Sequence, residues 1–160
     1  MNLKSLLFIS WLLVFSHICS SEPHSTSKSV YLDYVVKENV GSNLTTFSHR
    51  VARVTQTYKI IVARVGKSKA DKILNEELQK NISENQARWN ENMAVAHAKH
   101  MSEEEVLSLL NGGSESPYYP KRVALQGEIG KTMRELSENL LNQVVTDSVA
   151  SSLARVDGKI

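Results

Sequence analysis

The sequence predicts an all-α protein, a compact bundle of five or six helices that follows an N-terminal signal peptide. Three observations lead to this prediction. Apolar residues recur at steps of three and four along several segments, as on one face of a helix, whereas no segment keeps the alternation of a strand. Glycine and proline, which interrupt helices, number only 7 and 3 among 160 residues. Serine-based capping motifs mark further helix starts.

Composition limits the classes of function. Hydrophobic residues make up 41% of the chain and charged residues 22%, values typical of a globular domain. Nineteen Lys and Arg against seventeen Asp and Glu leave a net charge of +2, which argues against nucleic-acid binding. The single cysteine excludes an intramolecular disulfide and a metal site held by several thiolates. We expect no cofactor.

The first 21 residues are expected to be a secretory signal peptide. The segment begins with a positive charge at Lys4, and residues 6–15, which are apolar apart from Ser10, have about half the length that crosses a membrane. Cleavage after Ser21 would leave a mature chain without a transmembrane segment. We therefore expect an exported protein, either periplasmic or secreted. A lipid anchor on Cys19 is the alternative, and the bulky Ile18 before it disfavours that anchor.

The mature chain is expected to consist of a flexible lead-in and one helical domain. Residues 22–29 are polar and rich in Ser, Thr and Pro, which predicts the lead-in. The single helical domain covers residues 30–156. It opens with a short helix over residues 30–40, which is expected to end near Gly41.

The clearest helical periodicity lies between residues 44 and 65. Apolar residues follow one another there at alternating steps of three and four: Leu44, Phe47, Val51, Val54, Tyr58, Ile61 and Val65. This spacing places them on one stripe of a single helix of about six turns. Asn43 is expected to cap the start of this helix, and Gly66 is expected to end it.

Two more helices are expected to begin at Ser68 and at Ser83. The second start is a capping box, in which the Ser83 oxygen accepts a free backbone N–H and Gln86 reaches back. The helix that follows is expected to end near His100. The inward faces of the two helices comprise Ile73, Leu74 and Leu78 in the first and Trp89, Met93 and Ala96 in the second.

A second capping box, from Ser102 to Glu105, predicts the start of the next helix. Met101 before it and Val106 after it can form the hydrophobic staple that fixes a turn between helices. The glycines of segment 111–113 (Asn-Gly-Gly) predict its end.

A loop over residues 114–120 is expected to precede one long closing helix. The apolar face of that helix comprises Ile129, Met133, Leu136, Leu140, Val144, Val149 and Leu153. Gly127 and Gly130 near its start would permit a close helix crossing. Apolar stripes that are only half covered would also suit a homodimer.

The segment 97–106, His-Ala-Lys-His-Met-Ser-Glu-Glu-Glu-Val, together with Ser116, Pro117 and Lys121, resembles a bacterial exported family. That family is catalogued as domain of unknown function 2059. Its pattern is roughly Phe-Thr-Glu-Glu-Glu-Leu, then Phe-Tyr-x-Ser-Pro-x-Gly-x-Lys before a last long helix. The resemblance implies an envelope-targeted, all-helical domain with no established activity, cofactor or catalytic residues.

The chain departs from this pattern in the loop. Gly113 and Ser114 stand in the places of the aromatic pair, and Tyr119 replaces the glycine. These departures bear on a shared ligand more than on a shared fold.

The loop 114–122 is the leading candidate for a binding site. Two tyrosines lie between two prolines, and stiff amphipathic rings are favoured at recognition surfaces. The alternative is that the rings pack on the bundle and lock the loop. The candidate binding residues are Ser116, Pro117, Tyr118, Tyr119, Lys121 and Arg122.

A metal site is the second candidate. His97 and His100 are three residues apart on one helix face, and Glu103 follows across a turn, a set that could hold zinc with an open position. In the alternative interpretation, His100 interacts with the helix C-terminus and Glu103 with the next N-terminus.

A basic stripe for anionic envelope surfaces is the third candidate, formed by Arg50, Arg53, Lys59 and Arg64. The alternative is that these long side chains cover apolar surface at the edge of the core. No Gly-x-Ser-x-Gly elbow or other catalytic motif is present, so an enzyme is not expected. The leading hypothesis is an exported, non-catalytic interaction protein of the bacterial envelope that binds a protein partner through loop 114–122.

Overall fold

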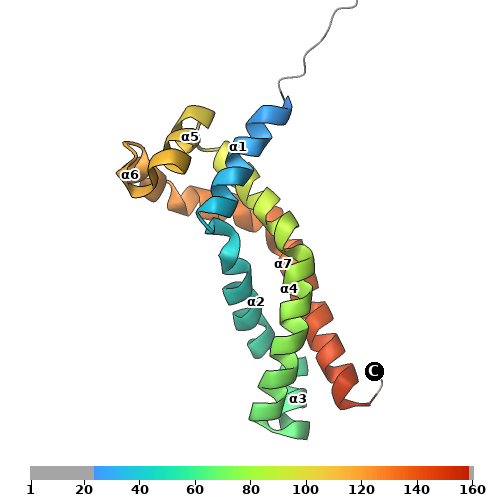
Figure 1. Ribbon diagram of the computed structural model, residues 1–160. Coiled ribbons are helices and arrows are strands. Elements are labelled where there is room, and N and C mark those ends of the chain that lie inside the picture. Colours follow the sequence, from blue (N-terminus) through green and yellow to red (C-terminus); the bar gives the residue numbers. More distant parts are fainter. Residues whose placement is uncertain (1–23, 159–160) are drawn as a thin grey trace, which may run out of the picture.

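Two long helices, α4 (Lys67–Ala98) and α7 (Gln126–Val156), pack against each other and organise the fold (Figure 1). The structure, a computed structural model, describes residues 24–158, with side chains from residue 30 onward. The predicted signal peptide at residues 1–21 lies outside the described residues. Within the described range, no helix is both long enough and apolar enough to cross a membrane.

The all-α prediction is confirmed for residues 24–158, which form seven α-helices, two short 3₁₀-helices and no strand. The predicted number of five or six helices is wrong. One predicted helix is divided, two predicted helices are continuous, and the predicted loop contains a short helix.

The N-terminal helix, α1 (His24–Lys37), begins upstream of the predicted start at Val30. It packs on α4 and on α5 (Glu103–Gly112). The buried Tyr31 hydroxyl donates a hydrogen bond of 2.9 Å to the Met101 carbonyl oxygen, which fastens α1 to the turn before α5. The 3₁₀-helix η1 (Val40–Ser42) then leads into α2 (Asn43–Val54).

The predicted single helix over residues 43–65 is interrupted at Thr55. Thr55 has an extended backbone, with φ −69° and ψ 150°, and separates α2 from α3 (Gln56–Val65). Its hydroxyl accepts the Tyr58 N–H at 3.2 Å and donates to the Ala52 carbonyl at 2.7 Å. Threonine therefore caps a new helix start within an otherwise helical apolar pattern. Because the break changes the register, Val54 is 69% exposed instead of inward.

The predicted helix start at Ser83 is wrong, because α4 continues through it. The Ser83 hydroxyl donates 2.7 Å to the Lys80 carbonyl within the helix, instead of accepting an N–H at a new N-terminus. The buried apolar residues of α4 lie on both sides of this point, and they include Leu74, Leu78, Ile82, Trp89 and Met93.

The capping box of α5 is confirmed. The Ser102 hydroxyl accepts the Glu105 N–H at 3.3 Å, and the Glu105 carboxylate accepts the Ser102 N–H at 3.0 Å. Met101 and Val106, the predicted staple residues, are both buried. Helix α5 is followed by η2 (Gly113–Glu115) and α6 (Tyr119–Ala124).

The inward face of α7 includes small polar residues that the apolar pattern does not indicate. Its predicted residues Ile129, Met133, Leu140, Val144 and Val149 are buried, but Leu136 is 36% exposed. Between them lie buried hydroxyl residues: Thr132, Ser137, Ser148 and Ser152. The Ser148 hydroxyl lies 3.4 Å from the Glu77 carbonyl oxygen of α4, so the two helix backbones approach closely there.

Candidate functional site

The predicted loop 114–122 is folded onto the end of the bundle, and Ser116 is part of its framework. Ser116 is buried, and its hydroxyl oxygen lies 2.8 Å from that of Ser108 on α5. The same oxygen accepts the Tyr118 N–H at 3.2 Å. Ser116 therefore shapes the turn between α5 and α6, and its hydroxyl is not exposed to a ligand.

Lys121 also has a partner within the fold. Its ammonium lies 2.5 Å from the Glu105 carboxylate, which at the same time completes the α5 capping box with Ser102. The hydrogen bonds from Lys121 and Ser102 lower the pKa of Glu105. Lys121 therefore ties α6 to the start of α5.

The exposed part of the segment is centred on Tyr119. Pro117, Pro120 and Tyr119 are exposed, with Tyr119 at 39%, whereas Tyr118 is half-buried. Val123 follows Tyr119 by four residues on α6 and is 45% exposed. Residues four apart on a helix share a face. Tyr119 and Val123 therefore form an exposed apolar face, which we call the α6 face.

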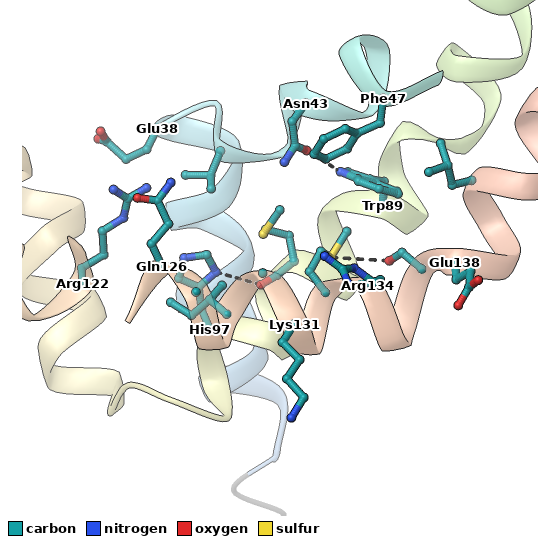
Figure 2. Close-up of a pocket in the computed structure, with 18 of the residues that line it drawn as sticks. Glu38, Asn43, Phe47, Trp89, His97, Arg122, Gln126, Lys131, Arg134 and Glu138 are labelled. Atoms are coloured by element: carbon teal, nitrogen blue, oxygen red, sulfur yellow. Dashed lines mark hydrogen bonds between the residues drawn. The ribbon is translucent and has the colours of Figure 1, made fainter. Parts of the chain in front are cut away.

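Arg122, the last candidate of the loop, lies in the lining of a groove of about 860 Å³. The groove is lined by Glu38, which follows α1, and by residues of η1, α2, α4, α6 and α7 (Figure 2). Its apolar lining comprises Val40, Phe47, Trp89, Met93, Ile129, Met133 and Leu141. Figure 2 shows Arg122, Gln126 and Glu38 toward one end of the groove, with Phe47 and Trp89 further along.

Trp89 is fixed within this groove. Its indole N–H donates a 2.9 Å hydrogen bond to the Asn43 side-chain oxygen, and its ring centre lies 6.3 Å from that of Phe47. The expected helix-capping role of Asn43 is therefore wrong, because its side chain accepts the indole proton while Ser42 occupies the N-cap position. Phe47, expected on the inward stripe of its helix, is 37% exposed.

Positive charges outnumber negative charges around the groove. Three cations contribute to its lining, Arg122, Lys131 and Arg134, against two carboxylates, Glu38 and Glu138. None of the three cations forms an ion pair with a carboxylate within residues 30–158. The cationic side chains of the groove are thus available to a bound anion.

His97 belongs to the lining of the groove and is almost fully buried, at 1% exposure. Its Nδ1 is 2.9 Å from the Met93 carbonyl oxygen, and its ring meets Tyr34 edge-on at 5.3 Å. Burial is the main cause that lowers the pKa of His97, and the Arg122 charge lowers it further, although the Met93 bond partly opposes both. His97 is therefore held neutral in the folded state at neutral pH.

Acidification should destabilise the fold through His97. An unfolded histidine titrates near pH 6.5, at about its reference pKa. Because the folded pKa is lower, the unfolded chain binds the proton first, and the free energy of unfolding should fall as the pH drops below about 6.5. This one proton changes the free energy of unfolding by at most about 1.4 kcal/mol per pH unit. The dependence disappears below the pKa of the folded state, where both states carry the proton. Urea unfolding at several pH values measures that slope.

The matched variants for this prediction are His97→Gln and His49→Gln. Burial also lowers the pKa of His49, and the Arg53 charge lowers it to a smaller extent. Each variant should therefore reduce the pH dependence of the free energy of unfolding by the contribution of the histidine that it removes. A His97→Gln slope equal to that of the wild type would show that His97 does not carry the effect.

The predicted metal ligands are engaged separately. His97 contacts the Met93 carbonyl, His100 Nε2 lies 2.8 Å from the Thr132 hydroxyl, and Glu103 is exposed. Among residues 30–158, no group of three or more His, Cys, Asp or Glu side chains is placed to hold a metal ion. A metal site at these residues stays a prediction.

The predicted basic stripe is partly neutralised. Arg53 lies 3.4 Å from the Asp71 carboxylate, and Arg64 pairs with Asp157. Arg50 and Lys59 are exposed. An anionic surface would therefore meet fewer available charges here than the sequence suggested.

The groove itself was not predicted, because its lining comes from segments far apart in the chain. The spacing of Trp89 and Met93 predicts the core face of α4, and both side chains are indeed buried, which gives no indication of a groove. Gly127 and Gly130 are the part of the groove that the sequence did single out, as the site of a close helix crossing. That crossing is absent among the described residues. A Cβ added at either glycine would have no atom within 4 Å, so both leave open space along the groove.

Comparison of the chain with protein-family models, with curated proteins and with solved structures finds no match. The resemblance to the exported family of unknown function therefore stays a prediction.

Proposed function

We propose that the protein is an exported, non-catalytic interaction protein of the bacterial envelope that binds a protein partner through segment 114–122. The observation that carries the proposal is the α6 face: Tyr119 of this segment and Val123, which directly follows it, are 39% and 45% exposed one turn apart. Tyrosine is enriched among the residues that dominate binding energy at protein interfaces.

The anchoring of α6 supports this proposal. The Lys121–Glu105 pair and the Ser116–Ser108 contact hold the segment against α5 before any partner arrives. A surface that is already ordered loses less conformational entropy on binding. Pro117 further restricts the backbone that leads into α6.

A pull-down from native envelope extract tests the proposal, with the Tyr119→Ala/Val123→Ser double variant beside the wild type. The matched control is Val54→Ser, which removes an exposed apolar side chain from α2. We expect a partner, identified by mass spectrometry, that wild type and control retain and the double variant loses. Circular dichroism verifies that all three are folded. Equal retention by all three proteins would contradict the proposal.

A further inference from the structure

We propose that the groove above Trp89 and Met93 binds a long-chain carboxylate, a single-chain anionic amphiphile whose carboxylate group lies at the Arg122 end. The inference concerns a surface other than the α6 face, and it stands or falls separately from the proposed protein partner.

The dimensions of the groove fit a single acyl chain. The lining residues on α7 extend from Gln126 to Asn142, which corresponds to about 24 Å of helix at 1.5 Å per residue. The volume of about 860 Å³ lies within the range of small-molecule sites, about 300–1,000 Å³. A long apolar ligand that extends along α7 would use this length.

The lining chemistry favours a flexible apolar chain. Met93 and Met133 face the groove from α4 and α7, and the unbranched, polarisable side chain of methionine adapts to irregular ligand surfaces. Phe47 and Trp89 add aromatic area beside them. Gly127 and Gly130 contribute no side chains to the α7 lining, and a Cβ at either position would have no atom within 4 Å.

Charge places the carboxylate at the Arg122 end. Arg122 is half-buried and lies near Tyr34: burial raises the pKa of the Tyr34 phenol, and the Arg122 charge partly opposes that rise. A positioned guanidinium can bind a carboxylate through two parallel hydrogen bonds. The Gln126 side chain lies at the same end (Figure 2) and can donate a further one.

The balance of charges around the groove favours an anionic ligand over a cationic one. Glu38 lies near Arg122 in Figure 2 and would repel a bound carboxylate, whereas Glu138 is on the next turn of α7 after Arg134. Lys131 and Arg134 add positive potential along the α7 side. With three cations against two anions, an anionic ligand is favoured over a cationic one of the same length.

Fluorescence of Trp89 provides the binding assay. The chain contains two tryptophans, so full-length protein carrying Trp11→Phe reports from Trp89 alone. The probes are palmitate, hexadecanol and hexadecyltrimethylammonium, each below its aggregation concentration. We expect a saturable change with palmitate, weaker binding of hexadecanol, and the weakest binding of the cation. Equal binding of all three, or no saturable change with palmitate, would overturn the proposal.

Gly130→Leu tests the location of the site without endangering the fold. The added side chain has open space around its Cβ, and it replaces a residue that destabilises helices by about 1 kcal/mol. We expect palmitate affinity to fall by at least about tenfold, as expected when a ligand's apolar contacts are blocked, while the melting temperature is kept or raised. The matched control is Ala150→Leu, an exposed position on α7 outside the groove lining, which should bind like the wild type.

Two charge variants test the orientation of the ligand. Arg122→Gln should weaken palmitate binding by about tenfold, because it removes a charge-assisted bond, whereas Glu38→Gln should strengthen it by about threefold. Changes of the same sign in both variants would overturn the placement of the carboxylate. Loss of the envelope protein partner in Gly130→Leu, with palmitate binding unchanged, would assign the groove to a protein segment and overturn the proposal.

Discussion

Replacing Glu84 with proline should lower the free energy of unfolding by about 3 kcal/mol or more. Glu84 is exposed, so the loss does not come from packing. It comes from the helix interior: residue 84 lies in the middle of α4, where proline removes a backbone hydrogen bond and clashes with the preceding turn. Urea unfolding followed by circular dichroism measures the change.

This variant distinguishes the structure from the helix start predicted at Ser83. If Ser83 capped a new helix, Glu84 would be its first residue, where proline is well tolerated. A free energy of unfolding within about 0.5 kcal/mol of the wild type would therefore support two helices and contradict a continuous α4. Glu84→Ala is the control, and it should change stability little, because the side chain is exposed and alanine favours helices.

The two capping boxes show how far local sequence patterns decide the fold. Both have a serine followed three residues later by Glu or Gln, but only the box of Ser102 begins a helix. At Ser83 the apolar positions continue in register from Leu78 and Ile82 to Trp89, and this uninterrupted face is buried. Burial of a continuous face outweighs a cap, which contributes about 1 kcal/mol.

Thr55 shows the reverse case. The apolar spacing continued across it, yet the chain ends α2 there and caps α3 with the threonine hydroxyl. Leu44 and Ile61 are fully buried, whereas Val54 is largely exposed. The break lets each half of the predicted stripe bury its own residues against α4 and α7. A pattern of spacings carries no information about such a change in direction.

The candidate site was predictable only where one segment forms it. The sequence singled out Tyr118 and Tyr119 because both lie between Pro117 and Pro120. The structure leaves the Tyr119 ring exposed and half-buries Tyr118. The groove needs Phe47, Trp89 and Met133 together, and no local pattern relates residues that far apart. Ser116 and Lys121 were assigned to binding because their partners on α5, Ser108 and Glu105, could not be identified from the sequence.

The buried serines of α7 are a feature that the apolar pattern does not indicate, and they affect how closely α4 and α7 pack. Ser148 and Ser152 are fully buried, and each donates to a carbonyl one turn earlier in α7. Ser148 also approaches the α4 backbone at Glu77. Small residues at these positions allow the two long helices to approach, so side-chain volume matters there more than polarity.

Ser148→Leu should therefore lower the free energy of unfolding by about 1–3 kcal/mol, because the larger side chain has to separate α4 from α7 or adopt a strained rotamer. Ser148→Ala should cost about 1 kcal/mol or less. It removes only the hydrogen bond from the hydroxyl to the Val144 carbonyl, which lies within the helix, and alanine is as small as serine. Urea unfolding of both variants, with the exposed Ala150→Leu as control, measures the difference. If leucine and alanine at position 148 were equally stable, the close approach of α4 and α7 would not be what the buried serines provide.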